Sequence, residues 1–499
     1  MVKTLAEINE KIRKGDAVVV RADEMPEIVA KKGPTRAAKE VDVVTTGTFG
    51  AMCSSGAFLN FGHSNPPIKM QKVWLNEVEA YGGLAAVDAY IGATELSQDR
   101  GMEYGGGHVI EDLVAGREIH MRCTSYGTDC YPTRKIETTI TLDDMNQAYL
   151  YNPRNAYQKY NAAVNTSARK LRTYMGTLLP NSGNVNYAGC GHISPLNNDP
   201  TYQTIGFGTK LFVGGVVGRV VGEGTQHSPK SGFGNIAIKA DLRGMSTKYL
   251  RGATIPEYGT SLFLGIGIPI PILNEELAKS TAVTNEQLET NLLDYGIARA
   301  DRPILRKVRY SELMSGRVEL NGQTIKTAPL SSFKIAYDIM DELVGWIEEK
   351  KFQFSTDFEC LPRNREFKPM KVSTRIPLVS EVMTRRVYTA HGGDSLKKVS
   401  SLMVEKGVDQ IPIADKRGLL LGIVTSFDIT RATSQGKHKL AEVMSRKVVT
   451  SKPSESIEET SRRLQRHGYN STPVVDEANR IVGIITLSDI NRVRGRLGR

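Results

Sequence analysis

The chain has 499 residues and a formal net charge of +11, and 40% of its residues are hydrophobic. Such a length exceeds one ordinary domain, so two or three domains are expected. No apolar run approaches the roughly 20 residues that cross a bilayer, and the first residues lack the apolar core of a signal peptide. We therefore expect a cytoplasmic protein without a membrane partner. Five cysteines, an odd number, favour reduced thiols over a disulfide framework.

The N-terminal stretch alternates short helices and strands. Apolar residues recur at helical spacing over 5–14, which predicts an amphipathic helix, and short strands are predicted at 17–20 and 41–44. The second strand runs into a loop over 45–56 that is rich in Gly, Thr and Ser and contains Cys53. A polar loop after a strand is a common place for a site in an α/β sheet, and a plain connection is the alternative.

A second cysteine segment runs from Cys123 to Arg134, with Cys130 between them. Its Gly, Asp and Pro residues predict a turn. A loop cysteine near arginines can exist as the reactive thiolate, so we hypothesise that Cys130 carries the chemistry. The alternative is that these cysteines are small buried hydrophobes.

The rest of the first 365 residues mixes loops, strands and helices. Residues 60–110 read as loop-rich, 135–142 as an alternating strand and 143–175 as partly helical. The Asn-Gly pair within 318–325 predicts a hairpin, and Ser331 or Ser332 is expected to cap a following helix. We therefore predict a mixed α/β domain over 1–365.

The last 120 or so residues contain an internal repeat. After a predicted linker at 366–378, units over 379–435 and 440–497 match at an offset of 61 residues. Each reads as a β-α-β-β-α unit, and two such units are expected to pack as a pseudo-twofold pair. From Leu378 onward, 21 basic and 13 acidic residues leave an excess of positive charge. This excess indicates an anionic small ligand rather than a nucleic acid, with a solvated basic face as the alternative.

The repeat resembles the tandem CBS domain, because a Gly-x-x-Thr-x-x-Asp ending occurs twice. The resemblance implies an adenosine-containing ligand, namely AMP, ATP or S-adenosylmethionine. Asp428 and Asp489 would accept hydrogen bonds from ribose hydroxyls, while Thr425 and Thr486 would reach phosphate or ribose. It also implies a homodimer formed through the CBS pair. The alternative is that both aspartates only cap the helices that follow them.

The first 365 residues resemble the L-aspartate semialdehyde sulfurtransferases of homocysteine biosynthesis. The resemblance rests on the segments 45–63, 74–83 and 128–133. It implies conversion of L-aspartate semialdehyde to L-homocysteine with a sulfide-derived or persulfide sulfur and no tightly bound cofactor. A ferredoxin-like iron–sulfur protein would supply the electrons. Cys130 would carry the sulfur as a persulfide, assisted by Cys53.

Other residues have candidate roles in that reaction. A second thiol, Cys53 or Cys123, is expected to release the sulfur by forming a disulfide with Cys130. Arg122 or Arg134 is a candidate for the substrate carboxylate.

His63 and His192 are candidate acids, with structural histidines as the alternative.

Three rival interpretations remain from the sequence. Cys123, Cys130, Cys190 and His192 form a candidate zinc or iron–sulfur site, although their spacing departs from the usual pattern, and no metal is predicted. Inosine monophosphate dehydrogenase also combines cysteine chemistry with CBS domains, but its CBS pair is inserted into a barrel. The third rival is a non-catalytic sensor of an adenosine ligand that binds a partner.

Overall fold

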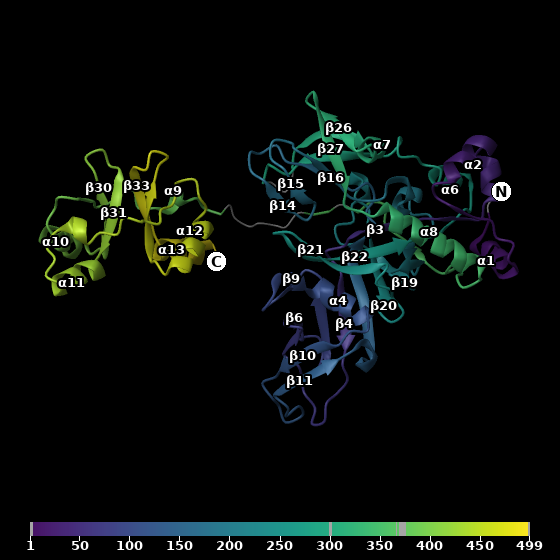
Figure 1. Cartoon of the computed structure of the whole chain (residues 1–499), viewed down its shortest axis with the longest axis horizontal. Helices are drawn as coiled ribbons and strands as arrows, with labels where there is room; N and C mark the ends of the chain where they lie inside the picture. Colours follow the sequence, from purple (N-terminus) through teal and green to yellow (C-terminus); the bar gives the residue numbers. More distant parts are fainter. Residues whose placement is uncertain (1–2, 299–301, 366, 369–375, 498–499) are drawn as a thin grey trace. The chain divides into compact units, whose positions relative to one another are not determined.

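The structure is a computed structural model that describes residues 3–298, 302–365, 367–368 and 376–497. Contacts divide the chain into two compact units, Met1–Lys368 and Pro369–Arg499 (Figure 1). The division falls within the stretch 366–378 predicted as a linker. Of that stretch, residues 366 and 369–375 lie outside the described residues.

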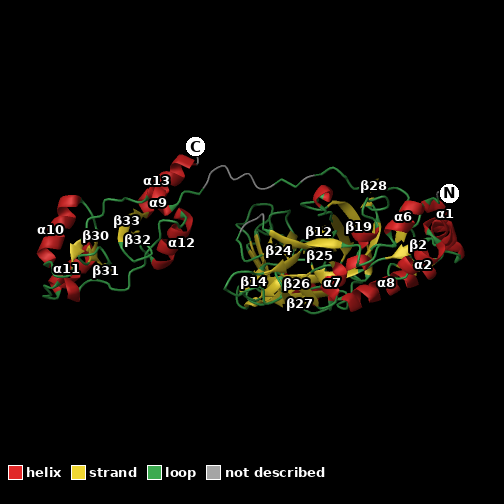
Figure 2. Cartoon of the chain, turned by 90° about the horizontal axis from the view of Figure 1, so that it is seen from above, coloured by secondary structure: helices red, strands yellow, loops and turns green. Residues whose placement is uncertain are grey.

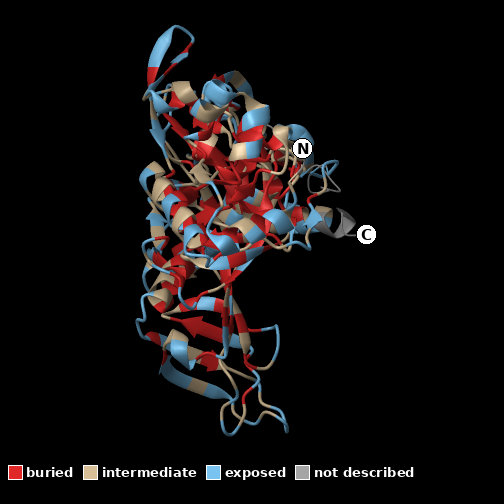
Figure 3. Ribbon diagram, turned by 90° about the vertical axis from the view of Figure 1, so that its right-hand side faces the viewer, coloured by how far each residue is buried: buried red, intermediate tan, exposed pale blue. Residues whose placement is uncertain are grey.

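An antiparallel sheet of 15 strands forms the centre of the first unit, and Figure 3 shows buried residues, in red, on strands in the interior. In order of neighbours the strands are β11 (Lys135–Ile140), β10 (Ile119–Thr124), β5 (Lys72–Leu75), β6 (Val78–Tyr81), β7 (Asp88–Gly92), β4 (Gly56–Asn60), β12 (Gln147–Asn155), β20 (Ile236–Asp241), β19 (Val216–Glu223), β18 (Lys210–Val213), β22 (Gly259–Gly267) and β21 (Leu250–Ile255). Off this path, β3 (Thr48–Ala51) pairs with β22, β8 (Leu96–Ser97) pairs with β6, and β9 (Gly101–Gly105) pairs with β8.

Two smaller sheets and several two-stranded pairs complete the unit. The first small sheet consists of β1 (Val19–Arg21), β2 (Val43–Thr45) and β23 (Ile270–Pro271). The six-stranded sheet has the order β25 (Ile304–Arg309), β24 (Glu289–Asp294), β13 (Ala162–Val164), β16 (Val185–Tyr187), β27 (Gln323–Pro329) and β26 (Arg317–Leu320). The two pairs are β14 (Leu171–Thr173) with β15 (Gly176–Leu178), and β17 (Gly206–Phe207) with β28 (Glu359–Cys360).

The helices of this unit are few and mostly short, and Figure 2 shows them along the margin of the strand-rich body. They are α1 (Leu5–Lys14), α2 (Met25–Lys32), α3 (Pro34–Glu40), α4 (Gly106–Val114), α5 (Pro195–Asn198), α6 (Glu275–Ser280), α7 (Tyr310–Met314) and α8 (Phe333–Glu348). The longest, α8, is capped by Ser332, whose hydroxyl accepts from the Ile335 N–H at 3.3 Å. It buries Ile339 and Leu343 against the Phe49 and Phe212 rings.

Several local predictions are confirmed because short-range chemistry decides them. At the start of α1, Thr4 and Glu7 form a reciprocal capping box, and Gly15 ends the helix with φ 86°. In the hairpin of β26 and β27, Asn321 and Gly322 have φ values of 51° and 77°, as a type I′ turn requires.

Three segments differ from their predictions. The helical expectation for 143–175 is wrong, because this range, which the structure describes throughout, contains no α-helix and contributes the strands β12, β13 and β14. The stretch 60–110 is not mainly loop, because it contributes β5 to β9 and α4. The segment 45–56, predicted as a single loop, is interrupted by β3, and a short turn follows this strand. In each case, pairing with strands distant in sequence overrides the local composition.

The second unit contains the two repeats. The first has α9 (Val379–Val382), β29 (Ala390–His391), α10 (Leu396–Lys406), β30 (Gln410–Ala414), β31 (Leu420–Thr425) and α11 (Ser426–Ser434). The second has α12 (Ile457–His467), β32 (Ser471–Val475), β33 (Ile481–Thr486) and α13 (Leu487–Leu497). Gly407 and Gly468 end α10 and α12 in the left-handed conformation, as the sequence predicts.

The two repeats exchange their leading segments. Met383, near the start of the first repeat, packs in the core of the second, and its side chain fills the space beside Gly483. Met444 takes the matching place beside Gly422 in the first repeat. A Cβ atom at Gly422 would lie 2.8 Å from the Ser445 carbonyl oxygen, so the shared glycine is needed for close packing.

Among the described residues, no helix combines the length and the apolar character needed to cross a membrane.

Candidate active site

Cys53 lies in the tight turn between β3 and β4, and hydrogen bonds hold this turn against β12. The Ser55 N–H donates to the Met52 carbonyl at 2.9 Å, which closes the turn. The Ser54 hydroxyl donates to the Arg154 carbonyl at 3.2 Å, and the buried Asn152 amide donates to the Ser55 hydroxyl at 2.7 Å. The position of the Cys53 backbone is therefore fixed by its neighbours on both sides.

A cavity of about 320 Å³ opens beside Cys53. Its aromatic wall includes Tyr157, Tyr160, Tyr174, Phe233 and Tyr258. The Tyr157 ring lies 4.7 Å from that of Tyr160 and 5.2 Å from that of Phe233, centroid to centroid. Such a cavity, largely apolar with few polar groups, is typical of a small-molecule site.

The environment of Cys53 favours the protonated form of its thiol. Burial raises the pKa of Cys53, and a hydrogen bond from the Ser261 hydroxyl to the sulfur, at 3.1 Å, partly opposes this effect. Burial also raises the pKa of Tyr157 and that of Tyr258. Formation of the nucleophilic thiolate therefore requires a compensating positive charge or a proton acceptor.

One side chain with a formal charge lines this cavity among the described residues. It is Arg154, near the end of β12. The candidate arginines from the sequence are elsewhere. Arg122 pairs with Glu77 at 2.8 Å and covers the Trp74 ring at 3.9 Å, so its guanidinium is already engaged. Arg134 belongs to the Cys130 loop, where it packs over Gly127.

Cys130 is exposed in the loop over 125–134, which joins β10 and β11. The Thr133 hydroxyl donates to the Pro66 carbonyl at 2.9 Å, and the Tyr131 ring stacks on His63. Pro66 and His63 follow β4, whereas Cys53 precedes it, and this strand of five residues spans about 16 Å. The structure therefore places the two cysteines at opposite ends of β4.

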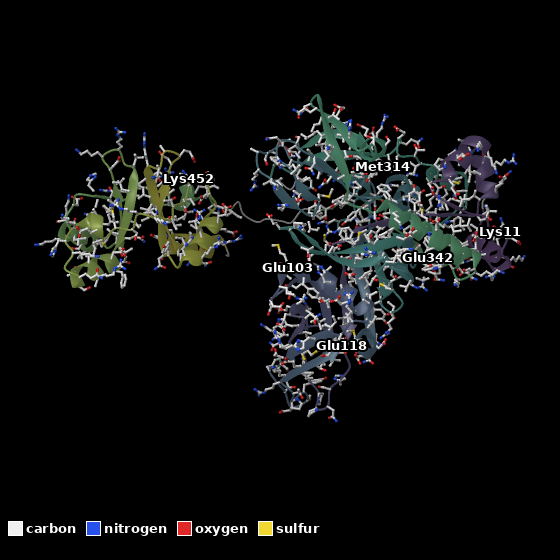
Figure 4. All side chains as sticks on the ribbon, viewed as in Figure 1. Lys11, Glu103, Glu118, Met314, Glu342 and Lys452 are labelled. Carbon is white, nitrogen blue, oxygen red and sulfur yellow. The ribbon has the colours of Figure 1, made fainter. Side chains whose placement is uncertain are left out.

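Figure 1 shows β10 and β11 at one end of the first unit, and Figure 4 labels the exposed Glu118 immediately before β10, the strand whose other end leads into the Cys130 loop. Cys130 is exposed on this loop.

The third candidate, Cys123, is fully buried within the core of the sheet. It lies in β10 between Val73 and Ile136 of the neighbouring strands, and burial raises its pKa. The turn therefore begins after Cys123 and does not include it. This arrangement is that of a small core residue.

The candidate metal ligands are not brought together. Cys190 is buried beside Thr48, whose hydroxyl donates to its sulfur at 3.7 Å, while Cys130 is exposed. Over the residues that the structure describes, no group of three His, Cys, Asp or Glu side chains is arranged to hold a metal. His192 is mostly buried and does not line the cavity.

In the second unit, the repeated Thr-x-x-Asp ending forms a helix cap in both repeats. The Asp428 Oδ2 atom accepts from the Thr425 N–H and hydroxyl, and its Oδ1 atom accepts from Arg431 at 2.8 Å. Asp489 repeats this pattern with Thr486 and Arg492. Half of the Arg431 side chain is exposed, so a ligand group can replace it at the Asp428 Oδ1 atom.

Sequence reasoning missed Ser261, Arg154 and the tyrosine wall. Ser261 is separated from Cys53 by 208 residues and reaches it only because β22 pairs with β3. The sequence did contain a signal for the tyrosine wall, namely the many Tyr and Asn residues within 143–175. The helical prediction for this range drew attention away from it.

These features define a two-part protein, with a cysteine-containing cavity on a mixed α/β unit and a paired β-α-β-β-α module. Residues 17–354 match the family described as homocysteine biosynthesis enzyme, sulfur-incorporation, and residues 379–434 and 440–495 each match the CBS domain. The chain belongs to this homocysteine biosynthesis family and carries a CBS pair. The family resemblance and the fold class predicted from the sequence are confirmed.

Similar proteins extend over the whole chain. A protein of Methanosarcina acetivorans named L-aspartate semialdehyde sulfurtransferase is 50% identical over 495 residues, which cover 99% of both chains. One of Methanocaldococcus jannaschii with the same name is 47% identical over 510 aligned positions, again with 99% coverage of both. Among solved structures, the CBS domain pair of protein MJ0100 with 5′-methylthioadenosine and S-adenosyl-L-methionine is 33% identical. It covers 24% of this chain and 98% of its own, with a TM-score of 0.24.

The contact between Ser261 and Cys53 makes a testable prediction. Replacing Ser261 with alanine removes the hydrogen bond that lowers the Cys53 pKa, so the pH midpoint of Cys53 alkylation should rise. Iodoacetamide labelling of the Cys53 peptide, followed by mass spectrometry over a pH series, measures this midpoint. Ser355→Ala, which removes a hydroxyl bonded to the Gly208 carbonyl, is the control. An unchanged midpoint in Ser261→Ala would contradict the assigned contact.

Proposed function

We propose that this protein converts L-aspartate semialdehyde to L-homocysteine. Its family membership and its full-length similarity to two proteins with the sulfurtransferase name support the proposal. The structural observation that carries it is the Cys53 thiol in an enclosed aromatic cavity with one cationic side chain. Such a cavity suits a small aldehyde that has an anionic group.

The overall reaction replaces the aldehyde oxygen by a thiol. One aldehyde, one sulfide, two electrons and two protons give one thiol and one water. A sulfur carried as a persulfide is two electrons more oxidised than sulfide. A persulfide route therefore takes four electrons and four protons from the donor.

In this proposal, Cys130 carries the sulfur and Cys53 releases it. The terminal persulfide sulfur attacks the carbonyl carbon, a C–S bond forms, and the carbonyl oxygen takes a proton. The Cys53 thiolate then attacks the Cys130 sulfur, which breaks the S–S bond of the adduct and leaves a Cys53–Cys130 disulfide. The released hydroxythiol loses water to give a thioaldehyde. Two electrons reduce the thioaldehyde to homocysteine, and two more reduce the disulfide.

This sequence of steps makes two demands on the protein. The loop over 125–134 has to meet a Cys53 cavity during turnover, within one chain or between the two chains of a dimer. An external electron donor is also required, and the family resemblance suggests a ferredoxin-like iron–sulfur protein. Cys123 takes no part in this proposal, because its side chain is buried in the core.

The persulfide assignment predicts a specific mass change. After treatment with polysulfide, which supplies sulfur without a separate oxidant, the Cys130 peptide should gain about 32 Da. Cys130→Ser should abolish homocysteine formation from L-aspartate semialdehyde, as should Cys53→Ser. Cys360→Ser removes another exposed thiol and should retain activity. Full activity in Cys130→Ser would exclude its role as the sulfur carrier.

For the second unit, we propose that the CBS pair binds an adenosine-containing regulator, AMP, ATP or S-adenosylmethionine, and that the pair also forms a homodimer. The CBS family match supports this assignment. The Oδ2 atoms of Asp428 and Asp489 cap helices, so Oδ1 is the atom available to ribose hydroxyls once Arg431 or Arg492 moves away. The caps and the ligand site thus share the same two carboxylates.

The shared carboxylates lead to a prediction with two variants. Asp428→Ala with Asp489→Ala removes the carboxylate half of each capping box together with the ribose acceptors, while the hydroxyl caps of Thr425 and Thr486 remain. Asp428→Asn with Asp489→Asn keeps an oxygen for the cap but loses the charge. Both should bind AMP, ATP and S-adenosylmethionine at least about 10-fold more weakly in calorimetry, because a charged acceptor is lost. Wild-type affinity for these ligands in both variants would refute the assignment.

A further inference from the structure

We propose that Arg154 binds the α-carboxylate of the aldehyde substrate in the Cys53 cavity. This inference rests on the proposed function and adds the residue that selects an amino-acid aldehyde over a simple aldehyde.

A β-bulge turns Arg154 away from the regular alternation of its strand. The register between β12 and β20 shifts between Asn152 and Asn155, so Pro153 and Arg154 face only Ala237 on the other strand. Bulges redirect side chains and are frequent next to active sites. The Arg154 N–H donates to the Asn152 side-chain oxygen at 2.8 Å, which holds the bulge in place.

The Arg154 guanidinium lacks an anionic partner. Its Nη1 atom donates to the Gln226 side-chain oxygen, a neutral acceptor. Its Nε atom is buried and has no hydrogen-bond partner, and no carboxylate of the described residues pairs with it. A buried cationic donor without a partner is unfavourable, so an anion that enters the cavity gains the full strength of a charge-assisted bond.

Other arginines near the cavity are already neutralised or stacked. Arg172 pairs with Glu257 at 2.9 Å, and Arg302 covers the Tyr295 ring at 4.1 Å. The cavity wall contributes no Asp or Glu side chain among the described residues. The positive charge of Arg154 is therefore available to a ligand and not consumed by the protein.

Arg154 and Cys53 are placed to act on the two ends of one small molecule. The Ser54 hydroxyl, next to Cys53, donates to the Arg154 carbonyl, and both the Arg154 charge and Cys53 influence the pKa of Tyr157. L-Aspartate semialdehyde has a four-carbon chain with a carboxylate at one end and the aldehyde at the other. With the carboxylate on the guanidinium, the aldehyde remains free to face the sulfur chemistry. Tyr174 and Tyr258 also line the cavity, and aromatic rings attract ammonium groups.

The test compares two aldehydes that differ only in the carboxylate. L-Aspartate semialdehyde and 3-aminopropanal, its decarboxylated counterpart, are titrated into the full-length protein by calorimetry without sulfur or electron donor. We expect the wild-type protein to bind the first about 10- to 100-fold more tightly, from one charge-assisted pair. In Arg154→Gln, this ratio should fall to within about threefold of unity. In Arg154→Lys it should be intermediate, because lysine keeps the charge but lacks the planar fork.

The matched control is Arg251→Gln, an exposed arginine of β21 whose Nε donates to the Thr247 carbonyl at 3.1 Å. In Arg251→Gln, the ratio of the affinities for the two aldehydes should equal that of the wild-type protein. Two results would overturn the inference about Arg154 without affecting the proposed function. One is an affinity ratio in Arg154→Gln equal to that of the wild-type protein, and the other is equal binding of the two aldehydes by the wild-type protein. If the wild-type protein bound neither aldehyde, the proposed function would fail together with it. If Arg154→Gln does not fold, the wild-type and Arg154→Lys ratios decide the outcome.

Discussion

The hydrogen bonds of Asn152 are the constraint on which the cavity depends. This buried amide donates to Ser55 in the β3–β4 turn and accepts from the Arg154 N–H in the bulge of β12. It therefore joins the turn that presents Cys53 to the bulge that presents Arg154. Neither feature is stable in isolation, since a short turn and a bulge each leave backbone groups unpaired. The thiol and the guanidinium are positioned as one unit, because one side chain satisfies both segments.

The two proposed cysteines differ in the way that their tasks require. Cys53 is enclosed, and its sulfur accepts a hydrogen bond from Ser261, which suits a step that must exclude water. Cys130 lies on an exposed loop, which suits the receipt of sulfur from another molecule. Because the two cysteines are separated along β4, the proposed transfer requires a movement within the chain or a contact between chains. In the CBS unit, too, a group with a fixed structural contact lies beside a group whose contact is exposed. There, one oxygen of each aspartate holds a cap and the other faces an exposed arginine.

Local chemistry made part of this structure predictable. The ends of α1, the Asn321-Gly322 turn and the repeat with its glycine caps all depend on residues within a few positions of one another. The cavity was not predictable in this way, because Ser261 and Arg154 reach Cys53 across pairings between distant strands. Cys123 illustrates the limit most clearly. Its nearness to Cys130 in sequence suggested a partnership, yet alternation along β10 directs its side chain into the core.

The central claim is that sulfur passes from Cys130 to the substrate and that Cys53 releases it. The most direct measurement is peptide mapping after persulfide-loaded enzyme has reacted with L-aspartate semialdehyde in the absence of an electron donor, so that the reaction stops before either reduction. We expect one disulfide between the Cys53 and Cys130 peptides, and this disulfide should form only when the aldehyde is present. A disulfide that includes Cys123, or thiols that remain free after the persulfide sulfur has been transferred to the substrate, would contradict it.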